Sequence, residues 1–260
     1  MKNKIHVHIP FNKVNTYLPK IKEYKLNLEI YFTSDSLDII KQEDIKKLLE
    51  SLDYKPSLSI HAPFMELSPG ARDSKVLAVT MERFTHALEI AEMLSASHIV
   101  FHSGYEKWNY DHKMDIWLET SVKTWQKVIE FSKHLNLKIA IENIFEDTPA
   151  NLELLMKELY SPKFGICFDT GHFNIFSTVG LDDWMAALAS YIVELHLHDN
   201  DKNSDAHYPI GEGTFDFRKL FSHIKNNDCL YTIETRSPEM VLRSIDKLKL
   251  YTKNLEDLSE

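Results

Sequence analysis

The feature that most constrains this chain is a regular alternation of short apolar, β-branched runs with longer amphipathic stretches. Flexible linkers do not interrupt the pattern, since only 7 Gly and 9 Pro occur in 260 residues. A repeated strand-then-helix order predicts a parallel sheet, because parallel strands need a crossover connection. The predicted strands cover residues 4–9, 26–32, 57–61, 97–102, 137–142, 164–169, 191–197 and 230–234.

The segments between these strands have the periodicity of helices. In one of them, Val122, Trp125, Val128 and Ile129 fall at three- and four-residue spacing and share a face. Strand–helix units of this number and length predict a single (β/α)₈ TIM barrel, an α/β fold, over residues 1–260. A doubly wound open sheet is the alternative, but the Gly-rich phosphate turn that usually follows its first strand is missing. The predicted helices cover residues 13–23, 42–52, 74–95, 116–135, 149–159, 181–190, 217–226 and 238–252.

The composition narrows the possible partners. Acidic residues outnumber basic ones by 39 to 30, for a net charge of −9, which argues against binding to duplex DNA. The two cysteines, Cys167 and Cys229, form neither a disulfide framework nor a CxxC zinc motif. No apolar run reaches the roughly 18 residues of a membrane span, and the first residues lack the apolar core of a signal peptide. We expect a cytoplasmic protein that does not bind membranes; its oligomeric state is not specified.

Polar side chains close six consecutive predicted strands. Because a barrel gathers its strand ends around one mouth, these side chains are expected to converge there, at the C-terminal ends of the strands. Taken singly, each has an ordinary structural explanation, such as a helix cap at Asp169. The strand-end residues are His61, His102, Glu142, Asp169, His196 and Glu234, and His172, Asp205 and His207 follow in the loops.

The joint arrangement points to metal. Carboxylates and imidazoles that converge without a cation would leave buried charge unpaired, and divalent ions resolve that conflict. Mixed nitrogen and oxygen ligands favour zinc, manganese or iron over calcium. The sequence therefore predicts a divalent-metal site, with zinc as the first expectation.

Several further residues are candidates for substrate contact. Lys202 and Arg236 lie close to predicted ligands and suit a small anionic substrate. The loop after the fourth strand carries Tyr105 and Trp108, whose rings could stack on a planar group or simply pack against a helix. His8 ends the first strand, where it either lines the site or makes a structural hydrogen bond.

Short motifs at the strand ends resemble a known group of barrels. In order and spacing they are similar to the xylose isomerase-like TIM barrels, a superfamily that includes AP endonuclease family 2, the endonuclease IV type. The resemblance covers nearly the whole chain. The motifs are SIHAPF (59–64), VFHSGY (100–105), IAIENIF (139–145), CFDTGHFNIF (167–176), ELHLHDN (194–200), DAHYPIGEG (205–213) and TIETRSP (232–238).

The resemblance to the sugar isomerase and epimerase branch implies one divalent metal. Its ligands would be Glu142, Asp169, His196 and Glu234, with the two glutamates as proton-transfer bases. That branch commonly has an arginine six residues after the metal-binding histidine, where this chain has Lys202.

The resemblance to the endonuclease IV branch implies up to three zinc ions and a phosphodiesterase. Attack by metal-bound hydroxide on a small, nucleotide-like phosphodiester is then the expected reaction, and isomerisation of a sugar or sugar phosphate is the alternative. The pattern also resembles the cobamide-remodelling phosphodiesterases. The implied metal sites are His61, His102 and Glu142; Glu142, Asp169, His196 and Glu234; and His172, Asp205 and His207. A one-metal isomerase does not need the Asp205–His207 pair.

Overall fold

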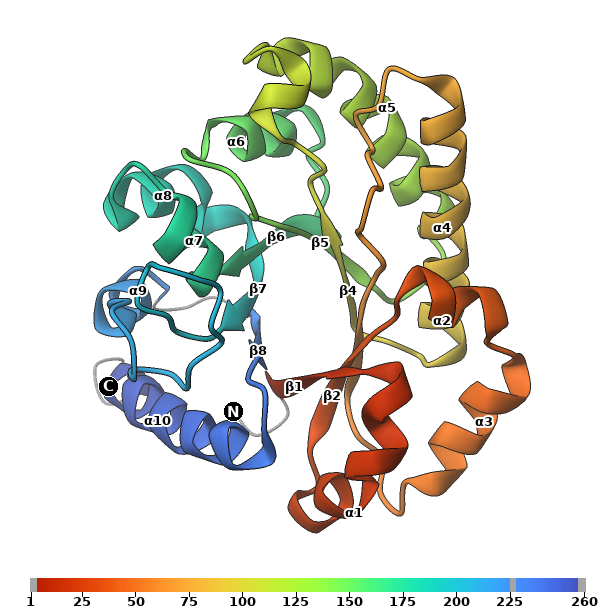
Figure 1. The fold of residues 1–260 in the computed structure, drawn as a ribbon, viewed down its shortest axis with the longest axis vertical. Coiled ribbons are helices and arrows are strands. Elements are labelled where there is room, and N and C mark those ends of the chain that lie inside the picture. Colours follow the sequence, from red (N-terminus) through yellow and green to blue (C-terminus); the bar gives the residue numbers. More distant parts are fainter. Residues whose placement is uncertain (1–3, 225–227, 257–260) are drawn as a thin grey trace.

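Eight parallel strands close into a barrel in chain order, as Figure 1 shows. This computed structural model describes residues 4–224 and 228–256. The predicted TIM barrel is confirmed, and each observed strand begins and ends within a residue or two of the predicted range. The strands are β1 (Ile5–Pro10), β2 (Asn27–Tyr31), β3 (Leu58–His61), β4 (His98–His102), β5 (Lys138–Glu142), β6 (Phe164–Asp169), β7 (Ile192–Leu197) and β8 (Leu230–Ile233).

Helices surround the barrel on the outside (Figure 1). Two short ones were not predicted, α2 (Ser34–Ile39) and α7 (Thr170–Phe176), because one or two turns are too short to show a helical repeat. The end of the predicted helix 217–226 lies outside the described residues. The remaining helices are α1 (Val14–Tyr24), α3 (Gln42–Ser51), α4 (Ser74–Met93), α5 (Met114–Phe131), α6 (Ala150–Glu158), α8 (Leu181–Leu188), α9 (Phe217–His223) and α10 (Pro238–Glu256).

The interior of the barrel is unusually polar. Apolar side chains such as Ile30 and Phe168 are buried in the large hydrophobic core, whereas the alternate positions of the strands point inward. There, the small cluster of Val100, Ala140 and Cys167 stands apart from the large core. Buried polar residues occupy much of the rest, namely His6, Glu29, Ser59, His98, Glu194, His196 and Thr232. Polar groups of this kind need partners, and His6 pairs with Ser59 as Thr232 does with Glu194. Among the described residues, His6 Nε2, His98 Nε2 and Glu194 Oε2 have no hydrogen-bond partner.

The buried imidazole of His98 at the start of β4 makes stability depend on pH. Burial lowers its pKa to about 3, with Lys138 acting in the same direction. As pH falls below 6.5, the unfolded chain therefore takes up a proton at this position while the folded chain does not, so stability is lost with acidification.

From pH 6.5 to 5, wild type should lose about 1.5 kcal/mol more unfolding free energy than His98→Gln. Urea unfolding at the two pH values measures this. Equal losses in the two proteins would show that His98 does not stay neutral in the fold.

Candidate metal centre

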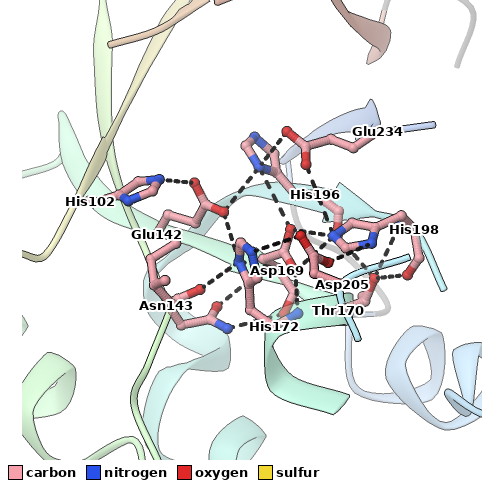
Figure 2. A network of polar contacts seen from close by, with 12 residues as sticks. His102, Glu142, Asn143, Asp169, Thr170, His172, His196, His198, Asp205 and Glu234 are labelled. Carbon is pink, nitrogen blue, oxygen red and sulfur yellow. Dashed lines mark hydrogen bonds and ion pairs between the residues drawn. The ribbon is translucent and has the colours of Figure 1, made fainter. Parts of the chain in front are cut away.

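The structure brings all nine predicted ligands to the carboxyl-terminal mouth of the barrel. Figure 2 shows most of them joined in one network of polar contacts. At its centre lies the four-ligand set of Glu142, Asp169, His196 and Glu234. The Nδ1 atom of His196 lies 3.2 Å from Glu234 Oε1, 3.5 Å from Glu142 Oε1 and 3.9 Å from Asp169 Oδ2.

This set fits a divalent cation. Among the described residues, buried His196 Nδ1 has no hydrogen-bond partner, although three carboxylates face it. Two ligands about 2.1 Å from one tetrahedral ion are themselves about 3.4 Å apart, close to the separations observed. Burial raises the pKa of Glu142 and Glu234, but neighbouring histidines outweigh it and hold both well below the usual range. Both carboxylates are therefore in the charged form that binds metal.

A buried carboxylate orients the metal-facing histidine from behind. Glu29 on β2 places both oxygens 3.3 Å from His196 Nε2, across the barrel from β7. The same residue lies 3.0 Å from His8 Nδ1, which lies 2.8 Å from Glu234 Oε1. Glu29 thus connects two members of the four-ligand set from the side away from solvent. His8 belongs to the site, one of the two roles considered for it.

Removing that support should weaken metal binding. We expect Glu29→Gln to lower metal affinity by about 10- to 100-fold, because the ring of His196 loses its charged partner. Competition with a chromophoric chelator measures the affinity. Unchanged affinity in a folded variant would mean that Glu29 does not act through His196.

A pair of imidazoles adjoins the other side of Glu142. His61 Nε2 and His102 Nε2 lie 3.0 Å and 3.3 Å from Glu142 Oε2. His61 Nδ1 is 2.9 Å from the carbonyl of Ala62, so it donates there and leaves Nε2 free as a ligand. Burial lowers the pKa of His102 to about 4, which keeps this ring neutral. Because Glu142 Oε1 faces His196 while Oε2 faces this pair, Glu142 is placed to bridge two ions.

A third group, the outer set, consists of His172, His198, Asp205 and His207. His207 Nε2 lies 2.7 Å from Asp205 Oδ2, and His198 Nδ1 lies 3.7 Å from Asp205 Oδ1. Both His198 Nδ1 and Asp205 Oδ1 are buried and have no hydrogen-bond partner among the described residues. The rings of His198 and His207 stack at 4.0 Å. One ligand atom from each of His198, Asp205 and His207 lies within 4.8 Å of the other two, close enough for a shared metal ion.

His198 was not predicted from the sequence, although a signal for it exists. Residues 194, 196 and 198 alternate as Glu, His and His, and alternate residues of a strand face the same way. The other ring nitrogen of His198, Nε2, lies 3.0 Å from Asp169 Oδ2. His198 therefore links the outer set to the four-ligand set.

One buried aspartate shapes the loop that carries Asp205 and His207. The carboxylate of Asp199 accepts hydrogen bonds from the backbone N–H groups of Gly211, Gly213 and Phe215 at 2.9–3.1 Å. His207 itself has a φ of +53°, in the left-handed region that side chains rarely adopt. A tightly tied loop thus holds this histidine in an unfavourable backbone conformation.

Charged neighbours also raise the pKa of two histidines at the site. Burial lowers the pKa of His172, but Asp169 and Glu142 outweigh it and raise the value to about 10. For His8, Glu234 and Glu29 outweigh burial in the same way and raise the pKa to about 10. The protonated imidazoles of His8 and His172 therefore balance the charge of the clustered carboxylates, and metal binding would release protons from these rings.

Of the two basic residues predicted to contact the substrate, one lies near the metal centre and the other does not line either cavity. Arg236 lies near the site, where its guanidinium donates a 2.8 Å hydrogen bond to the carbonyl of Asp205. Lys202 is exposed and lines neither of the two cavities beside the site.

Neither of the two predicted aromatic residues after β4 lines the mouth of the barrel over the ligands. The prediction for Tyr105 is corrected because its ring is buried between Tyr110 and Trp117. Trp108 is 70% exposed and packs edge-on against His112, so its contact with a substrate stays a prediction. The loop packs against α5, so the helix-packing explanation holds for Tyr105.

A cavity of about 360 Å³, the mouth cavity, opens above the ligands. Seven of the nine predicted ligands line it, all except Asp169 and His196, and the rest of its lining is largely aromatic. The ring of Phe64 stacks on His102 at 4.0 Å. None of these wall residues was predicted: Tyr31, Phe64, Ile144, Phe145 and Phe176.

The family follows from a comparison with known proteins. A family model described as xylose isomerase-like TIM barrel matches residues 25–256. The chain belongs to this family. A curated relative, the uncharacterized protein MJ1311 of Methanocaldococcus jannaschii, is 29% identical over 82% of this chain and 76% of its own.

Solved structures extend the comparison. A D-tagatose 3-epimerase-like protein is 26% identical, with a TM-score of 0.85 over 99% of this chain and 100% of that chain. The TTHB071 protein from Thermus thermophilus, soaked with ZnCl₂, is 23% identical, with a TM-score of 0.80 over 96% and 98%. Sugar 3-epimerases at 14% identity share the fold. By its name, the D-tagatose 3-epimerase-like protein favours the isomerase and epimerase alternative over phosphoester hydrolysis.

No helix within residues 4–224 and 228–256 combines the length and the apolar character needed to cross a membrane.

Proposed function

We propose that this protein is a metal-dependent phosphodiesterase that hydrolyses a small, anionic phosphodiester. The observation that carries the proposal is the outer set, where unpartnered Asp205 Oδ1 and His198 Nδ1 face each other at 3.7 Å. A one-metal isomerase needs only the four-ligand set. Here the imidazole pair and the outer set flank it, which supports a cluster of up to three ions, with zinc, manganese or iron as candidates.

Such a cluster suits phosphoester chemistry. Bound divalent ions would supply a water nucleophile of lowered pKa and neutralise phosphate oxygens. The chain's own residues bind and orient the substrate. In this proposal Arg236 would contact the phosphate from the β8 side, and the aromatic wall of the mouth cavity would exclude water and accept a planar group. Since its motifs resemble those of cobamide-remodelling phosphodiesterases, a cobamide is the first natural substrate to assay.

The test is hydrolysis of bis(p-nitrophenyl) phosphate by purified protein. We expect activity that disappears after chelation and returns with zinc, manganese or iron. No release of p-nitrophenol with any of the three metals would contradict the proposal.

A sugar isomerase or epimerase is the second candidate. It is supported by the names of the similar structures and by the positions of Glu142 and Glu234. Their Oε1 atoms lie 3.5 Å and 3.2 Å from the same nitrogen of His196. Two carboxylates around one ion could move protons at neighbouring substrate carbons.

This candidate predicts one metal per chain and exchange of a carbon-bound proton with solvent deuterium. NMR of ketoses and ketose phosphates incubated in deuterium oxide measures that exchange. Its absence across the panel would remove the candidate.

A further inference from the structure

A second cavity, the side cavity, adjoins the metal centre. It has a volume of about 370 Å³ and lies among β1, α1 and the start of α10. His8, His207 and Glu234 line both this cavity and the mouth cavity. The side cavity therefore borders the metal centre, and two of the shared residues, His207 and Glu234, are predicted ligands.

The deep walls of the side cavity are apolar. Val7, Ile9, Ile21, Leu28 and Val241 line it, and each is buried in the fold. Buried apolar side chains along an open cavity of this size offer a ligand an apolar wall. Its volume lies in the range of small-molecule sites, which are lined predominantly by apolar and aromatic side chains.

The rim of the side cavity is positively charged. Lys20 is paired with Glu23 at 2.9 Å. Among the described residues, Lys13 has no ion-pair partner, and Arg236 donates to the backbone carbonyl of Asp205 rather than to a carboxylate. The charges of these two lining residues are therefore not neutralised by an acid. Glu234, at the junction with the mouth cavity, is the one carboxylate among the described lining residues. An apolar body with an anionic substituent matches this combination.

We infer that the side cavity binds one ester group of the substrate, a planar or otherwise apolar group that carries its own negative charge. The reacting phosphate would lie at the metal centre, and this group would extend past His8 and His207 toward Lys13. The assignment to a substrate rests on the proposed function. The class of ligand does not, since it depends only on the cavity.

The binding test uses 8-anilinonaphthalene-1-sulfonate, an aromatic anion that fluoresces in apolar sites, and uncharged N-phenyl-1-naphthylamine. Val241→Trp fills the cavity from α10. Its matched control is Val79→Trp, on the half-exposed face of α4. Lys13→Glu reverses charge at the rim without disturbing the buried walls, so it keeps the inference testable if Val241→Trp misfolds.

Wild type and Val79→Trp should bind the anion alike, and Val241→Trp should bind it at least about tenfold more weakly. Lys13→Glu should weaken binding of the anion and leave binding of the uncharged probe unchanged. Equal affinity for the anion in Val241→Trp and wild type, or equal weakening of both probes in Lys13→Glu, would overturn the inference.

Competition then separates this inference from the proposed function. In wild type, the anion should raise the KM for bis(p-nitrophenyl) phosphate. Hydrolysis without such competition would remove the side cavity from the substrate site and leave the phosphodiesterase intact. If the probe binds in the side cavity but the protein hydrolyses no phosphodiester, the proposed phosphodiesterase function is wrong. The inference that the cavity binds an apolar anion would still hold.

Discussion

Glu142→Gln is expected to lower metal-dependent phosphodiester hydrolysis by on the order of 10³-fold, or about 4 kcal/mol of transition-state stabilisation. The two oxygens of Glu142 face different partners, with Oε2 near His61 and His102 and Oε1 near His172 and His196. Glutamine keeps the shape of the side chain but replaces one oxygen with an N–H donor and removes the charge. An ion on one side of the residue then loses its ligand.

Initial rates with bis(p-nitrophenyl) phosphate, at saturating metal, measure this effect. Glu106→Gln is the matched control, because Glu106 is a carboxylate at the same end of the barrel that caps a short turn and accepts from the N–H of Trp108. The control should keep its activity. Full activity in Glu142→Gln would show that this carboxylate does not bridge metal ions.

Gly171→Ala should disable the outer set while leaving the barrel intact. A Cβ atom at position 171 would lie 2.0 Å from Cε1 and 2.4 Å from Nδ1 of His198. That ring stacks on His207 and contacts Asp169, so it cannot move without taking its partners along. Misplacement of about 1 Å can cost on the order of 10² in rate. Overpacking should also cost about 1–3 kcal/mol in unfolding free energy.

The measurements are hydrolysis rate, metal content and urea unfolding. Gly180→Ala is the matched control, since a Cβ there would meet nothing closer than Asp183 Oδ2 at 3.5 Å. We expect Gly171→Ala to lose outer-set metal and activity, and Gly180→Ala to keep both. A Gly171→Ala protein with full metal content and normal rates would mean that the position of His198 is unimportant.

The barrel was predictable because each strand carries its own signal. Apolar runs such as 97–102 and 164–169 are separated by long amphipathic segments, and each observed strand lies within a residue or two of its predicted range. The short helices α2 and α7 gave no such signal. In α7, the residues Thr170–Phe176 form a helix that the side chain of Asp169 caps. An aspartate at the end of a strand can be a helix cap or a metal ligand, and the sequence does not distinguish the two. Here the carboxylate of Asp169 caps α7 and also belongs to the four-ligand set.

The metal centre was predictable in part, because a closed barrel brings strand ends together wherever they lie in the chain. Glu29 was missed because it lies inside β2 rather than at its end, and a polar barrel interior has no marker in a single strand. Tyr105 was misplaced because sequence alone does not tell whether an aromatic ring in a loop faces the mouth or, as here, α5. The mouth wall was missed for the same reason.

Metal content per chain is the most direct test of the cluster. Elemental analysis of purified, metal-loaded wild type should give about three divalent ions per chain. His207→Ala should lose one, and His112→Ala should lose none. The two histidines make a matched pair, since both have left-handed backbones, with φ of +53° and +57°, and only His207 lies at the centre. A single ion per chain in wild type, unchanged by His207→Ala, would contradict the cluster and favour the isomerase.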